Sequence, residues 1–334
     1  MGGLPRVNQL FAARVAKVAP EGGRVLVQDY HLALMGSELA RLRPDLRTAH
    51  FTHTPFADPS VIRMLPTATA TELLSAMAGF GACGFHTERW ASAFRAGCAM
   101  LDPPAGGTAP QAPTYVSPLS VDADLLHASA AEPATSQALA RIEEQIGGPD
   151  RQVVVRVDRM ELSKNLLRGF WAFEELLDLQ PERRERVVFV ALAYQNEVES
   201  TVDRINQRWG TRGWTPIVLE VEDDYPRSLA ALSRYDVLLV NPVRDGLNLV
   251  AKEGPLVNTR NGVLALSREA GAFEELQVAA LEVNPFDVSG TAAVLAEALD
   301  MGDEEKASRI AALREVITAR PPSAWLQDQL DAVR

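Results

Sequence analysis

Two cations follow an apolar run in the stretch RVDRMELSKN (Arg156–Asn165). Arg159 offers a planar fork of donors and Lys164 a compact charge, and both suit the oxygens of a diphosphate. The Ser and Lys of this stretch lie where a helix is expected to begin, so helix amides could join the same site. The expected chemistry is stabilisation of negative charge on a phosphate leaving group. The alternative is a solvated turn in which Arg159 pairs with Asp158 or Glu161.

A second polar stretch, NPVRDGLNLVAKEGPLVN (Asn241–Asn258), follows the apolar run VLLV. Gly246 permits a tight turn and a close approach of the backbone to a ligand. Asp245 can accept hydrogen bonds from sugar hydroxyls, and the first N–H groups of the following helix can bind an anion. Glu253 lies about two helical turns further on and can share a face with this loop. The alternative is an ordinary acidic helix start with a solvated Lys252–Glu253 pair.

Further polar residues follow apolar runs near the start of the chain, in VQDYH, FTHTPF and GFHT. His53 could hydrogen-bond a reacting sugar hydroxyl, although a lone histidine is more often a packed structural residue. Asp29 could equally be a plain helix N-cap for the segment that begins near Tyr30. His86 is the weakest candidate and could simply mark the exit of a strand.

The elements that must position these residues are short apolar runs that alternate with helical patterns. RVLVQD, RTAHFTH and ACGFHT form one series, and RQVVVRVD, RVVFVALA, TPIVLEV, YDVLLVNP, GVLALS and ALEVNP form a second. Runs that are apolar on both faces and separated by helices are typical of parallel sheets covered by helices. In such sheets ligands bind beyond the carboxyl ends of the strands, where the polar residues above are found. The fold class is therefore α/β, with two doubly wound, Rossmann-like domains.

We place the N-terminal domain at residues 1–125, the C-terminal domain at 126–315, and a C-terminal helix that packs back toward the N-terminal domain at 316–334. The composition, 47% hydrophobic and 23% charged, is that of a globular protein. A net charge of -11 argues against a nucleic-acid surface, and no apolar run is long enough to cross a membrane. Two cysteines give neither a disulfide framework nor a metal cluster, so a cytoplasmic protein is expected.

In order and spacing, these motifs resemble the trehalose-6-phosphate synthases, which are retaining glycosyltransferases of family 20 with the GT-B fold. The similarity is to the actinobacterial members and, more distantly, to the validoxylamine 7'-phosphate synthases. The stretches that carry the resemblance are Val25–Phe56, Arg63–Phe94, Arg156–Asn165, Asn241–Glu253, Leu264–Leu276 and Val283–Asp287.

The resemblance implies transfer of glucose from UDP- or GDP-glucose to glucose 6-phosphate, which gives α,α-trehalose 6-phosphate. It implies that Arg159 and Lys164 bind the diphosphate of the donor. Glucose hydroxyls are expected at Asp245, Gly246, Leu247 and Asn248, and the nucleotide with its ribose at Leu249, Val250 and Glu253.

The resemblance also implies that His53 contacts the donor sugar from the other domain and that Asp29 and Tyr30 help to bind the acceptor. The expected catalytic set is Asp29, His53, Arg159, Lys164 and Asp245. No cofactor or metal is expected. The expected partners are small-molecule substrates and, as an open possibility, a second copy of the chain, with neither nucleic acid nor membrane.

The chain departs from the family on the acceptor side. It begins near the point where the family has already passed a Gly-rich loop and an acceptor-phosphate arginine, so the N-terminal domain is expected to be incomplete. A second gap is expected after Ala193, where the family continues with another basic residue. These departures leave two alternatives open: a relative with a different sugar-phosphate or cyclitol-phosphate acceptor, and a non-catalytic regulatory subunit that binds a nucleotide sugar.

Overall fold

The computed structural model describes residues 3–101, 111–159, 161–194, 198–221 and 224–333. Its contacts divide the chain into two compact units. Unit 1 comprises Met1–Leu119 and Pro322–Arg334, and unit 2 comprises Ser120–Pro321. The division thus falls at Leu119, rather than at residue 125. Residue 316 lies inside a helix of unit 2, and the final helix begins at Pro322.

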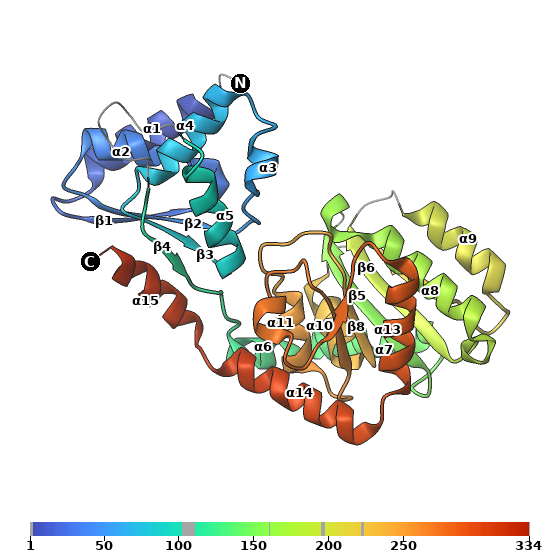
Figure 1. Cartoon of the computed structure of the whole chain (residues 1–334). Coiled ribbons are helices and arrows are strands. Elements are labelled where there is room, and N and C mark those ends of the chain that lie inside the picture. The colour runs from blue at the N-terminus through green and yellow to red at the C-terminus, as the bar shows by residue number, and fades with distance from the viewer. Residues whose placement is uncertain (1–2, 102–110, 160, 195–197, 222–223, 334) are drawn as a thin grey trace. The chain divides into compact units, whose positions relative to one another are not determined.

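Unit 1 is a four-stranded parallel sheet with helices around it (Figure 1). Its strands lie in the order β1-β2-β3-β4. Their bounds are β1 Arg24–Gln28, β2 Arg47–Thr52, β3 Ala82–Phe85 and β4 Thr114–Val116. The helices are α1 Gly3–Val18, the 3₁₀ turn η1 Tyr30–Leu32, α2 Met35–Leu42, α3 Pro59–Ile62, α4 Thr67–Ala78, α5 Glu88–Cys98 and α15 Pro322–Ala332.

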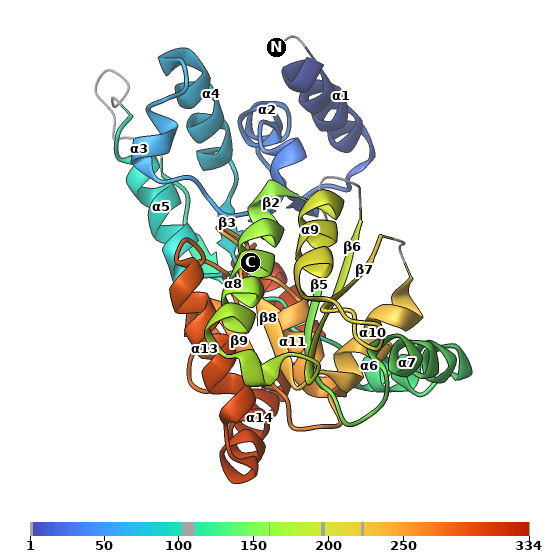
Figure 2. The same cartoon turned by 90° about the vertical axis from the view of Figure 1, so that its right-hand side faces the viewer.

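Burial explains why these stretches of unit 1 form a central sheet. Five of the six residues of β2 and all four of β3 are buried, as expected for strands that are covered on both faces. The helices α1, α2 and α4 lie side by side in both views (Figures 1 and 2). The final helix, α15, packs in unit 1, where Gln329 bonds to Gln28 and Asp328 accepts from Ser117.

Unit 2 contains a six-stranded sheet in which every described pairing is parallel. Its strands are β5 Gln152–Arg159, β6 Val187–Tyr194, β7 Ile217–Glu220, β8 Val237–Val240, β9 Val263–Ser267 and β10 Leu281–Val283. Its helices are α6 Ala123–Ala130, α7 Pro133–Ile146, η2 Leu162–Lys164, α8 Leu166–Leu179, η3 Pro181–Arg183, α9 Glu199–Trp209, α10 Tyr225–Arg234, α11 Val250–Val257, α12 Phe273–Leu276, α13 Val288–Asp300 and α14 Asp303–Thr318.

The strand order of unit 2, β10-β9-β8-β5-β6-β7, locates its ligand-binding edge. Numbered from β5 as the first strand, this is the Rossmann order 3-2-1-4-5-6. From β5 the chain moves outward through β6 and β7, then returns to β8 on the other side of β5. Helix α8 packs beside α13, while α10 packs beside α7 and α11, so both faces are covered (Figure 1). The topological switch point therefore lies between the carboxyl ends of β5 and β8.

The α/β class with two parallel sheets is confirmed, as are the expected strand series and the final helix. The doubly wound order is found in unit 2, whereas the four strands of unit 1 lie in chain order, without a reversal. Among the described residues, no helix is long and apolar enough to cross a membrane.

Candidate functional site

Both polar stretches singled out in the sequence flank the switch point of unit 2. Arg159 is the last residue of β5, and Asn241 follows the end of β8, the neighbouring strand. The two loops contact each other, because Val243 N–H donates to the Ser163 carbonyl at 2.8 Å. The sheet topology thus brings together residues that lie about eighty positions apart in the sequence.

Lys164 and Asp245 form the centre of this site. Lys164 Nζ lies 2.6 Å from Asp245 Oδ2, and the two side chains are only 12% and 16% exposed. Asn248 Nδ2 donates to the same carboxylate oxygen at 3.0 Å. Shielding from water strengthens such charge interactions, so a ligand that enters here meets a cation and an acceptor that are already positioned. The structure therefore joins the expected phosphate-binding and sugar-binding residues.

Arg159 differs from Lys164 in its exposure. Its side chain is 73% exposed and pairs with Glu161 Oε1 at 3.2 Å, the surface ion pair that the alternative interpretation anticipated. Such a pair contributes about 0–1 kcal/mol, so it holds the guanidinium only weakly. A phosphate could readily replace Glu161 as its partner.

Arg156 is a cation of this stretch whose role the sequence did not reveal. Its guanidinium is fully buried and donates to Asp158 Oδ2 at 2.8 Å, to Asn241 Oδ1 at 2.7 Å and to the Lys164 carbonyl. Burial lowers the pKa of Arg156 and raises that of Asp158, and the attraction between the two charges opposes both shifts. Arg156 therefore supports the Lys164 turn from beneath. One sequence feature could have indicated this role: Arg156 interrupts the run of valines in β5, two residues before Asp158.

Asn165 fixes the start of α8. Its backbone is left-handed (φ 63°), and its Nδ2 donates to the carbonyls of Asn241 and Pro285 at 3.0 and 2.7 Å. The amide therefore ties together the loops that follow three strands. Because it makes no side-chain cap, the first N–H groups of α8 stay available to an anion.

The loop after β8 is shaped by Asn248 and Gly271. Asn248 carries the left-handed backbone (φ 76°), a role that the sequence suggested for Gly246. Gly246 is instead approached by Gly271, where an added Cβ would lie 2.0 Å from the Gly246 carbonyl oxygen. Leu247 is buried and its carbonyl accepts from Ala272 N–H at 2.8 Å. The loop backbone is therefore tightly held against the segment after β9.

Glu253 lies in the first turn of α11, which begins at Val250 with Leu249 as its N-cap. Its carboxylate is half-buried and makes no hydrogen bond or ion pair to the part of the chain that the structure describes. Burial raises the pKa of this group. The solvated pair considered above is wrong, because Lys252 is buried and pairs with Glu275 at 2.5 Å. Glu253 thus offers an acceptor to a ligand hydroxyl.

Asp29 of unit 1 occupies an unusual backbone conformation. With φ 63° and ψ 170°, it lies in a region that glycine alone adopts readily. Its side chain does not cap the following turn, so the N-cap interpretation is wrong. Its Oδ1 is shielded from solvent and has no hydrogen-bond partner among the described residues. Tyr30, the next residue, is 54% exposed and stacks on His31.

His50 is a second residue that sequence reasoning missed. It is fully buried, with Nε2 at 3.0 Å from the Asp29 carbonyl and Nδ1 at 3.3 Å from Thr52 Oγ1. Burial lowers its pKa to about 4, so the ring is neutral near pH 7. Because a carbonyl can only accept, His50 carries its proton on Nε2 and supports the strained Asp29 backbone. It lies within β2, whereas the sequence pattern points only to the residues that follow strands.

His53 is half-buried, and both of its ring nitrogens have partners. Its Nε2 lies 3.1 Å from Gln28 Oε1, and its Nδ1 lies 3.2 Å from Nε2 of His86. Burial lowers the pKa of His53, although the Asp29 carboxylate opposes that shift. His86, the weakest candidate from the sequence, is thus a direct partner of His53.

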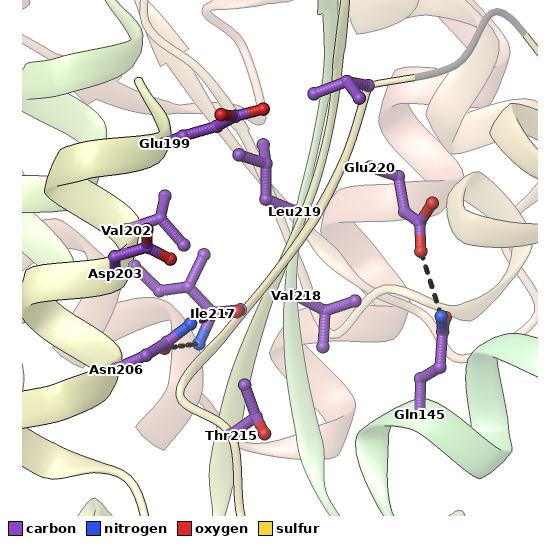
Figure 3. Close-up of a pocket in the computed structure, with 11 residues that line it drawn as sticks. Gln145, Glu199, Val202, Asp203, Asn206, Thr215, Ile217, Val218, Leu219 and Glu220 are labelled. Atoms are coloured by element: carbon purple, nitrogen blue, oxygen red, sulfur yellow. Dashed lines mark hydrogen bonds between the residues drawn. The ribbon is translucent and has the colours of Figure 1, made fainter. Parts of the chain in front are cut away.

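A hollow of about 470 Å³ in unit 2 lies away from these residues (Figure 3). It is bounded by α9, the edge strand β7 and Gln145 of α7, and Glu199, Asp203 and Glu220 line it. Carboxylates repel phosphate, so the switch point is the better candidate for a diphosphate.

The described residues contain no group of three or more His, Cys, Asp or Glu side chains that could hold a metal ion. Metal independence stays a prediction. The gap expected after Ala193 adjoins residues 195–197, which lie outside the described residues.

Comparison with known proteins supplies the wider context. The family model described as glycosyltransferase family 20 matches residues 4–334. The bifunctional trehalose-6-phosphate synthase/phosphatase of Thermoproteus tenax is 33% identical, over 96% of this chain and 46% of its own length. The trehalose-6-phosphate synthase of Cronobacter sakazakii is 32% identical, over 97% of this chain and 72% of its own. The chain thus spans about half of the first relative and nearly three quarters of the second.

Solved structures agree in fold. A trehalose-6-phosphate protein from E. coli bound with UDP-2-fluoro glucose is 30% identical, with a TM-score of 0.89 over 99% of this chain and 77% of its own. A UDP-forming α,α-trehalose-phosphate synthase from Burkholderia xenovorans, in complex with glucose-6-phosphate, is 29% identical, with a TM-score of 0.89 over 99% of this chain and 78% of its own.

Proposed function

This chain belongs to glycosyltransferase family 20, and we propose that it transfers glucose from UDP- or GDP-glucose to glucose 6-phosphate with retention of configuration. The product would be α,α-trehalose 6-phosphate. UDP is the favoured nucleotide, since the solved relatives include one bound with a UDP sugar and one described as UDP-forming.

The observation that carries the proposal is the Lys164–Asp245 pair at the switch point of unit 2. Transfer of a glucosyl group from a nucleotide sugar requires a cation at the diphosphate and an acceptor at the hydroxyls of the same sugar. Lys164 could supply the cation and Asp245 the acceptor, and their Nζ and Oδ2 atoms lie 2.6 Å apart. When a diphosphate binds, Lys164 can turn toward its oxygens and release the Asp245 carboxylate to accept from glucose hydroxyls.

The remaining residues extend this site. Arg159 would exchange Glu161 for the diphosphate, and the amides at the start of α8 would add partial positive charge. Backbone groups of Gly246, Leu247 and Asn248 would hold the sugar. Those of Leu249 and Val250, with the Glu253 carboxylate, would hold the nucleotide and its ribose. Each of these assignments is a proposal that rests on the position of the residue beyond the carboxyl ends of β5 and β8.

In the proposed reaction the bond from glucose C1 to the diphosphate oxygen breaks, and a bond to the acceptor oxygen forms on the same face of the sugar. The charge that leaves with the diphosphate is stabilised by Arg159 and Lys164. The proton of the acceptor hydroxyl passes to the departing phosphate, so no side-chain nucleophile is needed. Asp29 and Tyr30 are proposed to position the acceptor, and His53 to bind the donor sugar.

Binding and turnover test the proposal together. Calorimetry should show binding of UDP-glucose or GDP-glucose that glucose 6-phosphate tightens or consumes, and NMR should show an α,α-linked product. Donor binding that is indifferent to glucose 6-phosphate would favour another acceptor or a binding-only protein. Absence of donor binding would refute the proposal.

Charge-removing variants test the mechanism. Lys164→Ala and Arg159→Ala should each lower kcat by at least about a hundredfold, because each loses a group that stabilises the leaving charge. Arg41→Ala is the matched control, since Arg41 forms an exposed ion pair with Glu38 at the far end of α2. Near-normal turnover in either site variant, with circular dichroism unchanged, would contradict the mechanism.

A further inference from the structure

Four hydrogen bonds in unit 1 form a continuous chain through His53. The Leu119 amide lies 3.4 Å from His86 Nδ1, and His86 Nε2 lies 3.2 Å from His53 Nδ1. His53 Nε2 lies 3.1 Å from Gln28 Oε1, and Gln28 Nε2 donates to Gln329 Oε1 at 2.7 Å. This series of hydrogen bonds therefore runs from Leu119, in the segment after β4, to the final helix, α15.

The donor and the acceptor of each bond can be assigned in turn, starting from the Leu119 amide. A backbone N–H can only donate, so His86 Nδ1 accepts and neutral His86 carries its proton on Nε2. That proton points to His53 Nδ1, which must accept, so neutral His53 also carries its proton on Nε2. Gln28 then accepts through Oε1 and donates through Nε2, in agreement with its bond to Gln329. The four hydrogen bonds named above are therefore consistent in direction.

Two aromatic rings, those of Phe51 and Trp325, pack against His53. The Phe51 ring lies 5.0 Å from His53 and 4.9 Å from His86, between ring centroids. Trp325 of α15 lies 5.6 Å from His53 and 5.2 Å from Phe51. With both nitrogens bonded and two rings packed against it, His53 has one favoured orientation.

A glutamine at position 329 lowers the stability of the fold relative to an apolar side chain. It is 1% exposed, and its Nε2 has no hydrogen-bond partner in the described part of the chain. An unsatisfied buried donor costs about 1–3 kcal/mol, and an apolar side chain of similar size would avoid that cost. Its side-chain oxygen accepts from Gln28, so we infer that Gln329 orients Gln28.

We propose that Gln28, His86 and Gln329 are positioning residues that hold His53 as its Nε2–H tautomer, so that His53 donates a hydrogen bond to a substrate hydroxyl and turnover depends on α15. Gln28 is exposed, so a sugar oxygen can take its place as the acceptor from Nε2. The role in turnover rests on the proposed function, whereas the tautomer does not. The lowered pKa of His53 agrees with a neutral ring.

Nitrogen NMR of the full chain, labelled at its five histidines, tests the tautomer. His53 and His86 should each show a protonated Nε2 and an unprotonated Nδ1, with His53 assigned by the loss of its signals in His53→Asn. His86→Phe removes the donor to His53 Nδ1 and should give His53 a mixture of tautomers. Gln28→Glu keeps an acceptor and should preserve the Nε2–H form. A protonated Nδ1 on His53 in the unaltered chain would overturn the proposal.

Kinetics test the role of α15. Gln329→Met should lower kcat about tenfold, with little change in the donor KM and an unchanged circular dichroism spectrum. Gln327→Met is the control, because Gln327 is an exposed glutamine of the same helix whose side chain donates along the helix to Asp331. Equal kinetics in the two variants would overturn the proposal. Absence of turnover in the unaltered chain would refute the proposed function alone, since the NMR result still decides the tautomer.

Discussion

At the scale of single residues, the backbone of Asp29 has an unfavourable conformation that packing alone does not explain. A non-glycine residue at φ 63° and ψ 170° costs about 1–3 kcal/mol. Its amide donates to the Phe51 carbonyl at 2.7 Å and its carbonyl accepts from His50, so neighbours on β2 impose the conformation. The strained backbone holds a carboxylate oxygen that has no hydrogen-bond partner among the described residues, in agreement with the proposed role in acceptor binding.

Replacing Asp29 by glycine should separate stability from activity. Asp29→Gly relieves the strain and should raise the free energy of unfolding by about 1 kcal/mol, after the entropic cost of glycine. It should also lower turnover at least tenfold, because the carboxylate is lost. Denaturant unfolding and the transfer assay measure the two effects. Asp29→Asn keeps the strain, so equal stabilisation by both variants would show that backbone strain is not the cause.

His50 should make stability depend on pH. Its pKa is about 4 in the folded chain and 6.5 when unfolded, so between these values the unfolded state binds more protons. Its contribution is therefore complete above about pH 6.5, is lost as the pH falls toward 4, and changes little below that. The interval corresponds to about 3 kcal/mol. Unfolding of His50→Gln across this range should show a shallower pH dependence, and parallel curves would refute the assignment.

At the scale of elements, the loop after β8 depends on a segment that follows another strand. Asp245 N–H donates to the Glu269 carbonyl at 3.1 Å, and Gly271 N–H donates to the Asp245 carbonyl at 3.1 Å. The Gly246 backbone can hold its place only because Gly271 has no side chain.

Gly271→Ala should therefore displace the loop after β8 and weaken binding at the proposed donor site. The added Cβ would lie 2.0 Å from the Gly246 oxygen, so the loop must move, at a cost of about 1–3 kcal/mol. Calorimetry should show weaker binding of UDP-glucose. Gly213→Ala is the control, since nothing lies within 4 Å of the position of its Cβ. Equal donor affinity in both variants would show that this contact does not shape the site.

At the scale of the whole molecule, local cations must overcome an unfavourable net charge of -11. Arg159, Lys164 and the amides at the start of α8 supply positive potential where the diphosphate is expected, while the carboxylates near β7 make that edge unsuitable.

If these groups suffice, the reaction should not need a divalent ion. Exhaustive treatment with EDTA should leave kcat and the donor KM unchanged, and added Mg²⁺ should not raise the rate. The transfer assay measures both, with metal content checked by elemental analysis. Loss of activity that Mg²⁺ restores would contradict this prediction.

The sequence by itself determined the α/β class, the two strand series and the stretches that carry Arg159, Lys164 and Asp245. Apolar runs and strand-end polar residues are local patterns, and burial on both faces of a parallel sheet imposes them directly. Only the tertiary structure decided which distant residues meet: Lys164 with Asp245, Gly271 with Gly246, and His53 with His86 and, through Gln28, with Gln329. It also decided that Arg156 is buried and bonded to the Lys164 turn and that Asp29 is strained. These features depend on strand order and close packing between segments, which no local pattern encodes.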